Sequence, residues 1–446
     1  MKLYSLILSL LFFSNILFSQ QLNLTLDDCI KLALKNNENL KNSILDENIS
    51  KAVSKEYLSI GLPQIYVDGG LKYNYEVQKS LIDISRFMPG VPEGTEQEVQ
   101  FGQTYEGRFD FNIDQMIFNG SYFVGLSATK ELEKLSNKLT QRTEIDIYES
   151  VSKAYYTVLN TKSRIDLVNN NIERLLTLLE ESKQLYDNGF IEKLDIDRIT
   201  VSYNNLQSEK IKTDRLYDLS LFVLKFQIGI PLNQEIKLIG NLNEDILENF
   251  DFDLSKFDYN KRIEYSILKT DRNLKSYDLK NNRSQYLPQI YVNYNYGLNT
   301  SASSYDLFFD SYRWKNFGTI GLKLVVPIFD GFLKRSKINQ SKYKIEQIDN
   351  QLSFLERSID LQINQSVVDY SNSKESLEIT SKNLDLALSI YNASEKKYKE
   401  GVGSNLEVLN ANAGLKQAQT NYYNAVYEVI ISKINLEKTL GTLYNN

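Results

Sequence analysis

The sequence predicts a duplicated α+β fold, in which a unit of two strands, one very long helix and one returning helix occurs twice. Three observations predict it: two long stretches without glycine or proline, segments in which apolar and polar residues alternate, and short motifs that recur in the same order. Motifs that recur in order indicate an internal duplication. The predicted strands cover about 64–76 and 105–118 in the first copy, and about 289–299 and 317–329 in the second.

The N-terminus has the pattern of a secretory signal peptide. Lys2 precedes an apolar run over residues 3–18, and small and polar residues follow. The run is short for a membrane span, and a retained anchor helix is the alternative interpretation. We therefore expect residues 1–20 to be a signal peptide. The single cysteine, Cys29, cannot form an internal disulfide and is expected to be buried as a free thiol.

The recurring motifs define the two copies. The motif Leu-Pro-Gln-Ile-Tyr-Val occurs at 62–67 and again at 287–292, and a second motif, Ile-Phe-Asn/Asp-Gly, occurs at 117–120 and 328–331. The second pair lies closer together in the sequence, so the first copy has a longer connection within 77–104. The predicted organisation is a first repeat at 21–230, a connecting segment at 231–260 and a second repeat at 261–446.

Each predicted strand has one apolar and one polar side. Such alternation over ten or more residues indicates strands. A soluble sheet that packs its apolar side on a core is one interpretation. The strand length, the tyrosines and phenylalanines on the apolar side, and the restriction of charges to the other side favour a membrane barrel with a water-filled lumen. The expected lumen residues are Asp68, Lys72, Asn74, Arg108, Asp110, Asn293, Asn295 and Lys323.

Four strands are too few for a barrel, which needs about eight. Open sheet edges are not tolerated in lipid, so the chain is expected to form an oligomer. Three copies would supply twelve strands.

The two stretches without glycine or proline, 126–188 and 332–400, each exceed 60 residues. As helices they would be rods of roughly 100 Å. Each is followed by a break that contains glycine and by a returning helix, at about 194–227 and 405–438. Apolar residues recur at steps of three and four, which predicts coiled-coil packing. A filamentous coiled-coil protein is an alternative, but it leaves the inserted strands unexplained. One heptad series is Tyr370, Leu377, Leu384, Tyr391 and Tyr398.

Composition excludes several classes of function. The formal net charge is −6, which disfavours a nucleic-acid partner, and the chain has no histidine. The commonest general base and transition-metal ligand is therefore missing. The sequence also contains no glycine-rich phosphate loop and no cysteine cluster. We expect no enzyme, no cofactor and no metal site, although a periplasmic enzyme is a third alternative.

Taken together, these features resemble the TolC family of outer-membrane efflux proteins. Residues 24–37, LTLDDCIKLALKNN, are similar to the family's N-terminal helix, 401–411 to its helix–turn–helix tip, and 438–443 to its C-terminal end. The resemblance implies a trimer in the outer membrane of a Gram-negative bacterium, with a twelve-stranded barrel and an α-helical tunnel across the periplasm. The implied partners are a periplasmic adaptor, an inner-membrane pump that is proton-driven or of the ABC type, and outer-membrane lipid. An outer-membrane channel for type I protein secretion is the alternative, and a coiled-coil surface protein is another.

The resemblance also implies roles for residues at the tunnel tip. Acidic residues after the second tip turn narrow the mouth in the family, and here Glu407 and Asn410 take those positions. Asp195 and Asp197 correspond to them in the first copy, although an acid in a first helical turn also simply complements the helix dipole. The residues expected in the adaptor-docking turns, with positive φ at the glycines, are Gly189, Gly401, Gly403 and Ser404.

Overall fold

The computed structural model describes residues 22–242 and 257–444. The expected signal peptide therefore lies outside the described residues. The chain divides into two compact units. We call them the helical unit (Met1–Glu47, Ser136–Lys269 and Asn350–Asn446) and the sheet unit (Asn48–Leu135 and Thr270–Asp349). Among the described residues, no helix combines the length and the apolar composition that a membrane-crossing helix needs.

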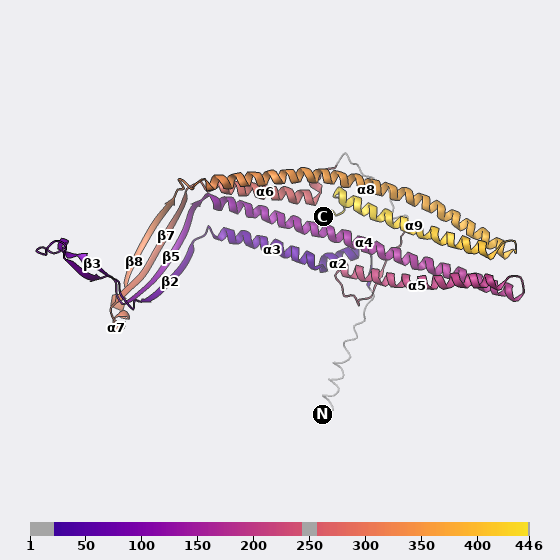
Figure 1. Cartoon of the computed structure of the whole chain (residues 1–446), viewed down its shortest axis with the longest axis horizontal. Coiled ribbons are helices and arrows are strands. Elements are labelled where there is room, and N and C mark those ends of the chain that lie inside the picture. Colours follow the sequence, from indigo (N-terminus) through magenta and orange to yellow (C-terminus); the bar gives the residue numbers. More distant parts are fainter. Residues whose placement is uncertain (1–21, 243–256, 445–446) are drawn as a thin grey trace, which may run out of the picture. The chain divides into compact units, whose positions relative to one another are not determined.

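The helices of the two copies match in length, as expected for a duplicated chain. Each copy has a helix before its strands, a very long helix after them and a returning helix (Figure 1). The pairs are α3 (Glu38–Ser59) and α6 (Ile263–Ser284), of 22 residues each, α4 (Gly120–Asp187) and α8 (Leu333–Lys399), of 68 and 67, and α5 (Lys193–Gln227) and α9 (Asn405–Leu440), of 35 and 36.

The sheet unit contains one antiparallel sheet of four strands in the order β2-β5-β7-β8. The strands lie side by side (Figure 1), so the two copies share one sheet through the β5–β7 pairing. Their bounds are β2 (Gln64–Tyr73), β5 (Tyr105–Asn119), β7 (Gln289–Ala302) and β8 (Lys315–Val325).

The strand ends differ from the expected segments. β2 stops at Tyr73 rather than 76, while β7 continues to Ala302. β8 begins at Lys315 and stops at Val325, four residues short of the expected end. Pro327 follows shortly after, and proline has no N–H group to donate to a ladder, which explains the early end.

The connections between the paired strands contain structure of their own. In the first copy, the long connection forms a hairpin of β3 (Lys79–Asp83) and β4 (Glu96–Gln100), with the short helix η1 (Ile84–Arg86) between them. The sequence analysis did not predict these two strands. In the second copy, the connection holds α7 (Tyr305–Phe308) and η5 (Ser311–Arg313).

Short elements complete the helical unit. β1 (Leu22–Leu24) pairs in parallel with β6 (Ile236–Leu238), which gives structure to part of the connecting segment at 231–260. Within that segment, residues 243–256 lie outside the described residues, and the short helix η4 (Tyr259–Lys261) follows them.

Helix α2 (Leu26–Asn36) begins with a capping box. The Thr25 hydroxyl accepts a hydrogen bond from the N–H of Asp28, and the Asp28 carboxylate accepts one from the N–H of Thr25. Cys29 on this helix is fully buried, and burial raises the pKa of its thiol to about 12. The thiol is therefore protonated and unreactive at neutral pH.

Long helices pack side by side in the helical unit, where α4 accompanies α5 and α8 accompanies α9 (Figure 1). In the heptad series of α8, Tyr370, Tyr391 and Tyr398 are buried, and the two leucines between them are partly buried. The Tyr398 hydroxyl lies 2.8 Å from the hydroxyl of Ser182 on α4. Leucine, isoleucine and tyrosine side chains from all four helices form one cluster there, as the coiled-coil spacing predicts.

An ion-pair group joins the end of α9 to α4. The Lys438 ammonium group lies 2.9 Å from Asp146 and 2.5 Å from Glu149. Burial alone would raise the pKa of Glu149, but hydrogen bonds from Lys153 and Lys438 outweigh it and hold that pKa below the ordinary 4.5. Burial opposes the charge of Lys438 as well, but its bonds to the two carboxylates raise its pKa above 10.5.

We predict that Lys438→Met lowers the free energy of unfolding by about 1–2 kcal/mol at neutral pH, because it removes the cation that bonds to both Asp146 and Glu149 and leaves Glu149 with Lys153 alone. The loss is fully present at pH 7. It shrinks as the pH falls through the lowered pKa of Glu149, where the carboxylate is protonated in either variant. Thermal unfolding in detergent, followed by circular dichroism at pH 7 and below pH 4, measures it. Lys382→Met, at an exposed pair with Glu378, is the control and should change nothing. Equal effects at the two positions would contradict the prediction.

Candidate lumen face and tip turns

The polar side of the sheet is connected across its strands by hydrogen bonds between side chains. The Asn295 amide on β7 donates to Asn112 on β5 at 2.7 Å and to Asp110 at 3.1 Å. The Asn112 amide donates in turn to Asp68 on β2 at 3.2 Å. The register places these residues opposite one another, so the amides satisfy carboxylates that would otherwise repel across the strands.

Asp110 is the most buried acid of this side, with 7 % of its surface exposed. The Arg108 guanidinium donates to it at 2.5 Å and also lies 5.0 Å from the centre of the Phe317 ring. Gly297 makes room for this arrangement. A Cβ atom there would lie 2.8 Å from both the Asp110 carboxylate and the Phe317 ring, closer than packed atoms come.

The remaining expected lumen residues lie on the same side. Lys72 is 3.7 Å from Glu106, whose carboxylate also accepts a hydrogen bond from the Asn74 amide. Asn293 donates to Asp114, which accepts a second bond, of 3.0 Å, from the Tyr66 hydroxyl. The last expected residue, Lys323, lies opposite Tyr291 and is exposed.

The opposite side of the sheet is apolar and exposed. Ile65, Ile113, Tyr294 and Ile320 lie opposite one another and form a row across all four strands. Ile320 has 78 % of its surface exposed and Leu322 has 72 %. A soluble monomer rarely exposes so continuous an apolar surface, so this side requires an apolar covering.

The two tip turns lie between the long helices and the returning helices. Gly189 and Gly401 have φ angles of 78° and 73°, as expected. The expectation of positive φ at Gly403 was wrong. This residue is needed for a steric reason instead, since a Cβ there would lie 2.9 Å from Cβ of Lys397 and 3.0 Å from the backbone nitrogen of Tyr398.

At the start of α9, Ser404 caps the helix. Its hydroxyl accepts a hydrogen bond of 3.2 Å from the N–H of Glu407. The Glu407 carboxylate lies 3.4 Å from the ammonium group of Lys397, near the end of α8. The charge of Glu407 therefore has both a helix dipole and a lysine beside it. Lys397 could not be predicted from the sequence, because the pairing crosses the turn and follows no helical spacing.

The N-terminal ends of α5 and α9 lie next to each other within the helical unit. The buried Asn405 amide donates to the backbone carbonyl of Asp195 at 2.8 Å. The Asp195 carboxylate lies 3.4 Å from Arg198, while Asp197 and Asn410 are exposed. This hydrogen bond joins the two tips, and the four expected mouth residues do not bond to one another in any contact found among the described residues.

Both turns expose apolar side chains that the sequence analysis missed. Phe190 in the first turn and Val402 in the second each have 76 % of their surface exposed. Leu194 and Leu406, in the first turns of the helices that follow, are about half exposed. Phe190 and Val402 each adjoin a glycine of the turn, and the two leucines lie in a first helical turn. The hydrophobic periodicity of the sequence does not predict exposure at such positions.

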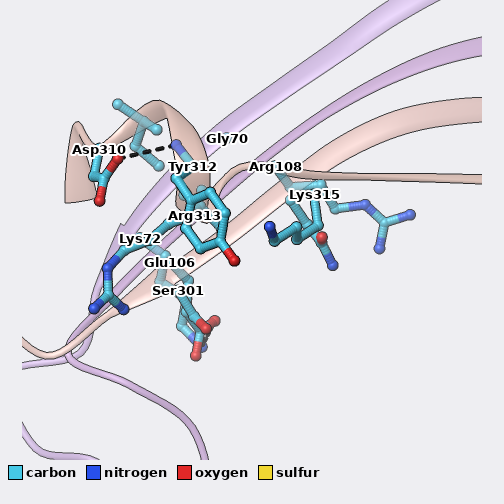
Figure 2. A pocket seen from close by; sticks show the side chains of 13 residues that line it. Gly70, Lys72, Glu106, Arg108, Ser301, Asp310, Tyr312, Arg313 and Lys315 are labelled. Carbon is cyan, nitrogen blue, oxygen red and sulfur yellow. Dashed lines mark hydrogen bonds and ion pairs between the residues drawn. The ribbon is translucent and has the colours of Figure 1, made fainter. Parts of the chain in front are cut away.

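A pocket of about 830 Å³ lies on the polar side of the sheet, at the end where the strands meet their connections (Figure 2). Its walls come from all four strands and from the connection that contains η5. They include Lys72 and Glu106, described above, together with Arg313 and Lys315. The pocket therefore continues the polar side of the sheet.

Comparisons with known proteins agree with this geometry. Residues 268–442 match the family model described as outer membrane efflux protein. The outer membrane protein TolC of Salmonella enteritidis is 21% identical over 346 residues, which are 74% of this chain and 68% of that protein. The alkaline protease secretion protein AprF of Pseudomonas aeruginosa is 21% identical over 425 residues, 93% of this chain and 84% of AprF. The crystal structure of the outer membrane protein VceC from Vibrio cholerae superposes with a TM-score of 0.71 at 14% identity and covers 93% of this chain and 96% of VceC.

The fold is therefore shared with VceC, and strands are inserted between long helices. The resemblance to the TolC family of outer-membrane efflux proteins is confirmed, and so is the expected location in the outer membrane.

We predict that Gly403→Ala lowers the thermal midpoint of the purified protein, because the added methyl group displaces the end of α8 at a cost of about 1–3 kcal/mol. Gly414→Ala in α9 is the matched control. A Cβ there meets nothing within 4 Å, so the gain in helix propensity should leave the midpoint unchanged or higher. A midpoint for Gly403→Ala equal to that of the wild type would show that the turn tolerates a side chain.

Proposed function

We propose that the chain is one subunit of a trimeric exit duct of a tripartite efflux system, which passively exports solutes across the outer membrane. A periplasmic adaptor and an inner-membrane pump would deliver the solutes. The observation that carries the proposal is the two-sided sheet with an exposed apolar side, built between helices of 67 and 68 residues. The apolar side would face lipid and the polar side a water-filled lumen.

The open edges of the sheet support a trimer. β2 and β8 are the outer strands, so each has one edge without a strand partner among the described residues. Unpaired backbone groups cost several kcal/mol each in hydrocarbon, which requires β2 of one copy to pair with β8 of the next. Three copies give twelve strands, above the minimum of about eight for closure. The long helices of the three copies would then enclose a periplasmic tunnel.

The tip turns are the proposed adaptor-docking site. Gly189, Gly401, Gly403 and Ser404 shape the turns, and the exposed side chains of Phe190 and Val402 provide an apolar contact surface. Exposed apolar side chains at these helix ends suit binding of a protein partner, since the centres of protein interfaces are rich in aromatic and aliphatic side chains.

The proposed tunnel mouth carries Glu407 and Asn410 on α9 and Asp195 and Asp197 on α5. Three copies would place a ring of carboxylates there, which favours cations. The ion pairs of Glu407 with Lys397 and of Asp195 with Arg198 weaken the ring, and leave Asp197 as its acid without an ion pair among the described residues.

A channel for type I protein secretion is the second candidate. The observation that favours it is the similarity to AprF, which is named as a protease secretion protein and is matched over 93% of this chain. Both candidates use the same duct, and they differ in the cargo and in the pump.

We predict that a photocrosslinking amino acid at Ser404 captures a periplasmic adaptor in cells, because Ser404 is exposed beside the second tip turn. Mass spectrometry identifies the captured partner. The type of pump encoded with that adaptor then distinguishes an efflux channel from a protein-secretion channel. The control is the same probe at Gly90, in the β3–β4 hairpin, which should capture no adaptor. Absence of an adaptor at Ser404, while the protein is present in the outer membrane, would contradict the docking role.

We further predict that Leu322→Arg prevents assembly in the membrane, because its side of β8 would face lipid, where arginine costs about 2–4 kcal/mol. Thr319→Arg, three residues away on the polar side, should assemble normally. The amount of folded protein in the outer-membrane fraction measures both. Equal loss for the two variants would overturn the assignment of the two sides.

A further inference from the structure

The pocket lies at the end of the sheet that carries η5, and its charge is positive, unlike that of the chain as a whole. Four cationic and two acidic side chains line it, whereas the chain as a whole carries a formal charge of −6. Farther along the same side of the sheet, the charged groups include the carboxylates of Asp68, Asp110 and Asp114. The pocket is therefore a local positive region on an otherwise acidic side.

Two of its cations are already paired. Lys72 is 3.7 Å from Glu106, and Arg108 donates to Asp110 at 2.5 Å. Pairing of this kind fixes the two side chains and reduces their charge toward a ligand.

The other two cations, Arg313 and Lys315, have no ion pair in the part of the chain that the structure describes. The nearby acid, Asp310, uses a carboxylate oxygen to accept the N–H of Tyr312 at 3.0 Å, shown as the dashed line in Figure 2. Lys315 instead holds its ammonium group 3.9 Å from the centre of the Tyr312 ring. Two positive charges thus remain without a carboxylate.

The neutral groups of the pocket are hydrogen-bonding groups. Ser301 brings a hydroxyl and Asn299 an amide, both from the end of β7, and Tyr312 brings a phenol hydroxyl. The volume of about 830 Å³ is within the range of sites for small molecules. A guanidinium group and an ammonium group beside hydroxyls match a phosphate or carboxylate group on a hydroxyl-bearing molecule.

We propose that this pocket binds a small soluble organic anion that bears phosphate or carboxylate groups, with Arg313 and Lys315 as the principal cations. Given the proposed duct, three such pockets would line the outer end of the lumen and favour anions there. The preference for anions in the lumen rests on the proposed function. The binding of an anion in the pocket does not depend on that function.

The chain provides its own probe for binding. Trp314, the single tryptophan, lies between Arg313 and Lys315 in the sequence. A Cβ atom on the pocket residue Gly107 would lie 2.7 Å from the Trp314 ring, so this ring packs against the backbone of β5 from the side opposite the pocket. Its fluorescence should respond to a ligand.

The test is a titration of the purified full chain in neutral detergent with inorganic pyrophosphate, read by tryptophan fluorescence. We expect a saturable change in the wild type and at least a tenfold weaker affinity in Arg313→Gln/Lys315→Gln. The control, Lys337→Gln/Lys342→Gln, removes the same charge at exposed positions of α8 and should bind as the wild type does. Equal affinity in all three proteins, or no saturation in the wild type, would overturn the proposal.

A second arm separates a soluble anion from a lipid headgroup. Micelles doped with phosphatidylglycerol should not compete with pyrophosphate, because the pocket lies on the polar side of the sheet. A fluorescence response to the lipid without a response to pyrophosphate would overturn the proposal of a soluble ligand.

A third arm keeps the inference separate from the duct. In planar bilayers, the reversal potential under a salt gradient should shift toward cation preference in Arg313→Gln/Lys315→Gln, relative to the wild type and the control. A conducting pore with an unchanged reversal potential would refute the effect on selectivity and leave the duct standing. A protein that binds pyrophosphate but does not conduct would support the pocket and count against the duct.

Discussion

The unpaired backbone of two strands is the constraint on which the rest of this structure depends. β2 and β8 form the edges of a sheet that has one apolar and one polar side, and each has ten or eleven residues. In water such edges invite aggregation, and in hydrocarbon they are not tolerated. The apolar side adds the same demand, because it needs lipid or protein against it. The proposed association of several copies in a membrane would satisfy both demands at once.

The helical unit meets a different demand. Helices of this length have too little apolar surface to stand alone in water, so they pack in pairs along seven-residue stripes. The tyrosines of α8 show how polar groups are accommodated in such a stripe, since the hydroxyl of Tyr398 bonds to that of Ser182. Charged bridges such as the one from Lys438 to α4 act at the margins of the packed surfaces. The result is a long element without a large core.

Much of this fold was predictable from the sequence, because its signals are long. Alternation over ten residues locates β7, and a seven-residue spacing that begins at Tyr370 and ends at Tyr398 locates the buried stripe of α8. The β3–β4 hairpin was not predicted, since strands of five residues give too short a pattern. The end of β8 at Val325 was also not predicted, because it depends on the single residue Pro327 rather than on a pattern.

The sites were harder to predict, because their contacts cross between elements. The sequence placed the expected lumen residues on one side of the sheet, but it could not show that Asn295 bonds to Asn112, which requires the register of β5 and β7. It likewise could not show that Lys397 neutralises Glu407 or that Gly403 is needed for space rather than for its φ angle. The pocket cation Arg313 ends the short helix η5 and Lys315 begins β8, where no long periodic pattern locates a residue.

The pairing of β2 with β8 of a neighbouring copy is tested most directly by disulfide cross-linking. Cysteine replaces Gly70 on β2, where a side chain meets nothing within 4 Å, and is combined in turn with cysteine at Thr319, Gly321 or Lys323 on β8. Cys29 is buried and does not interfere. The account predicts that at least one combination gives covalent dimers and trimers and no larger species, since a closed ring of three leaves no free edge. Absence of cross-links in every combination of the folded protein, or a ladder that continues beyond three, would contradict it.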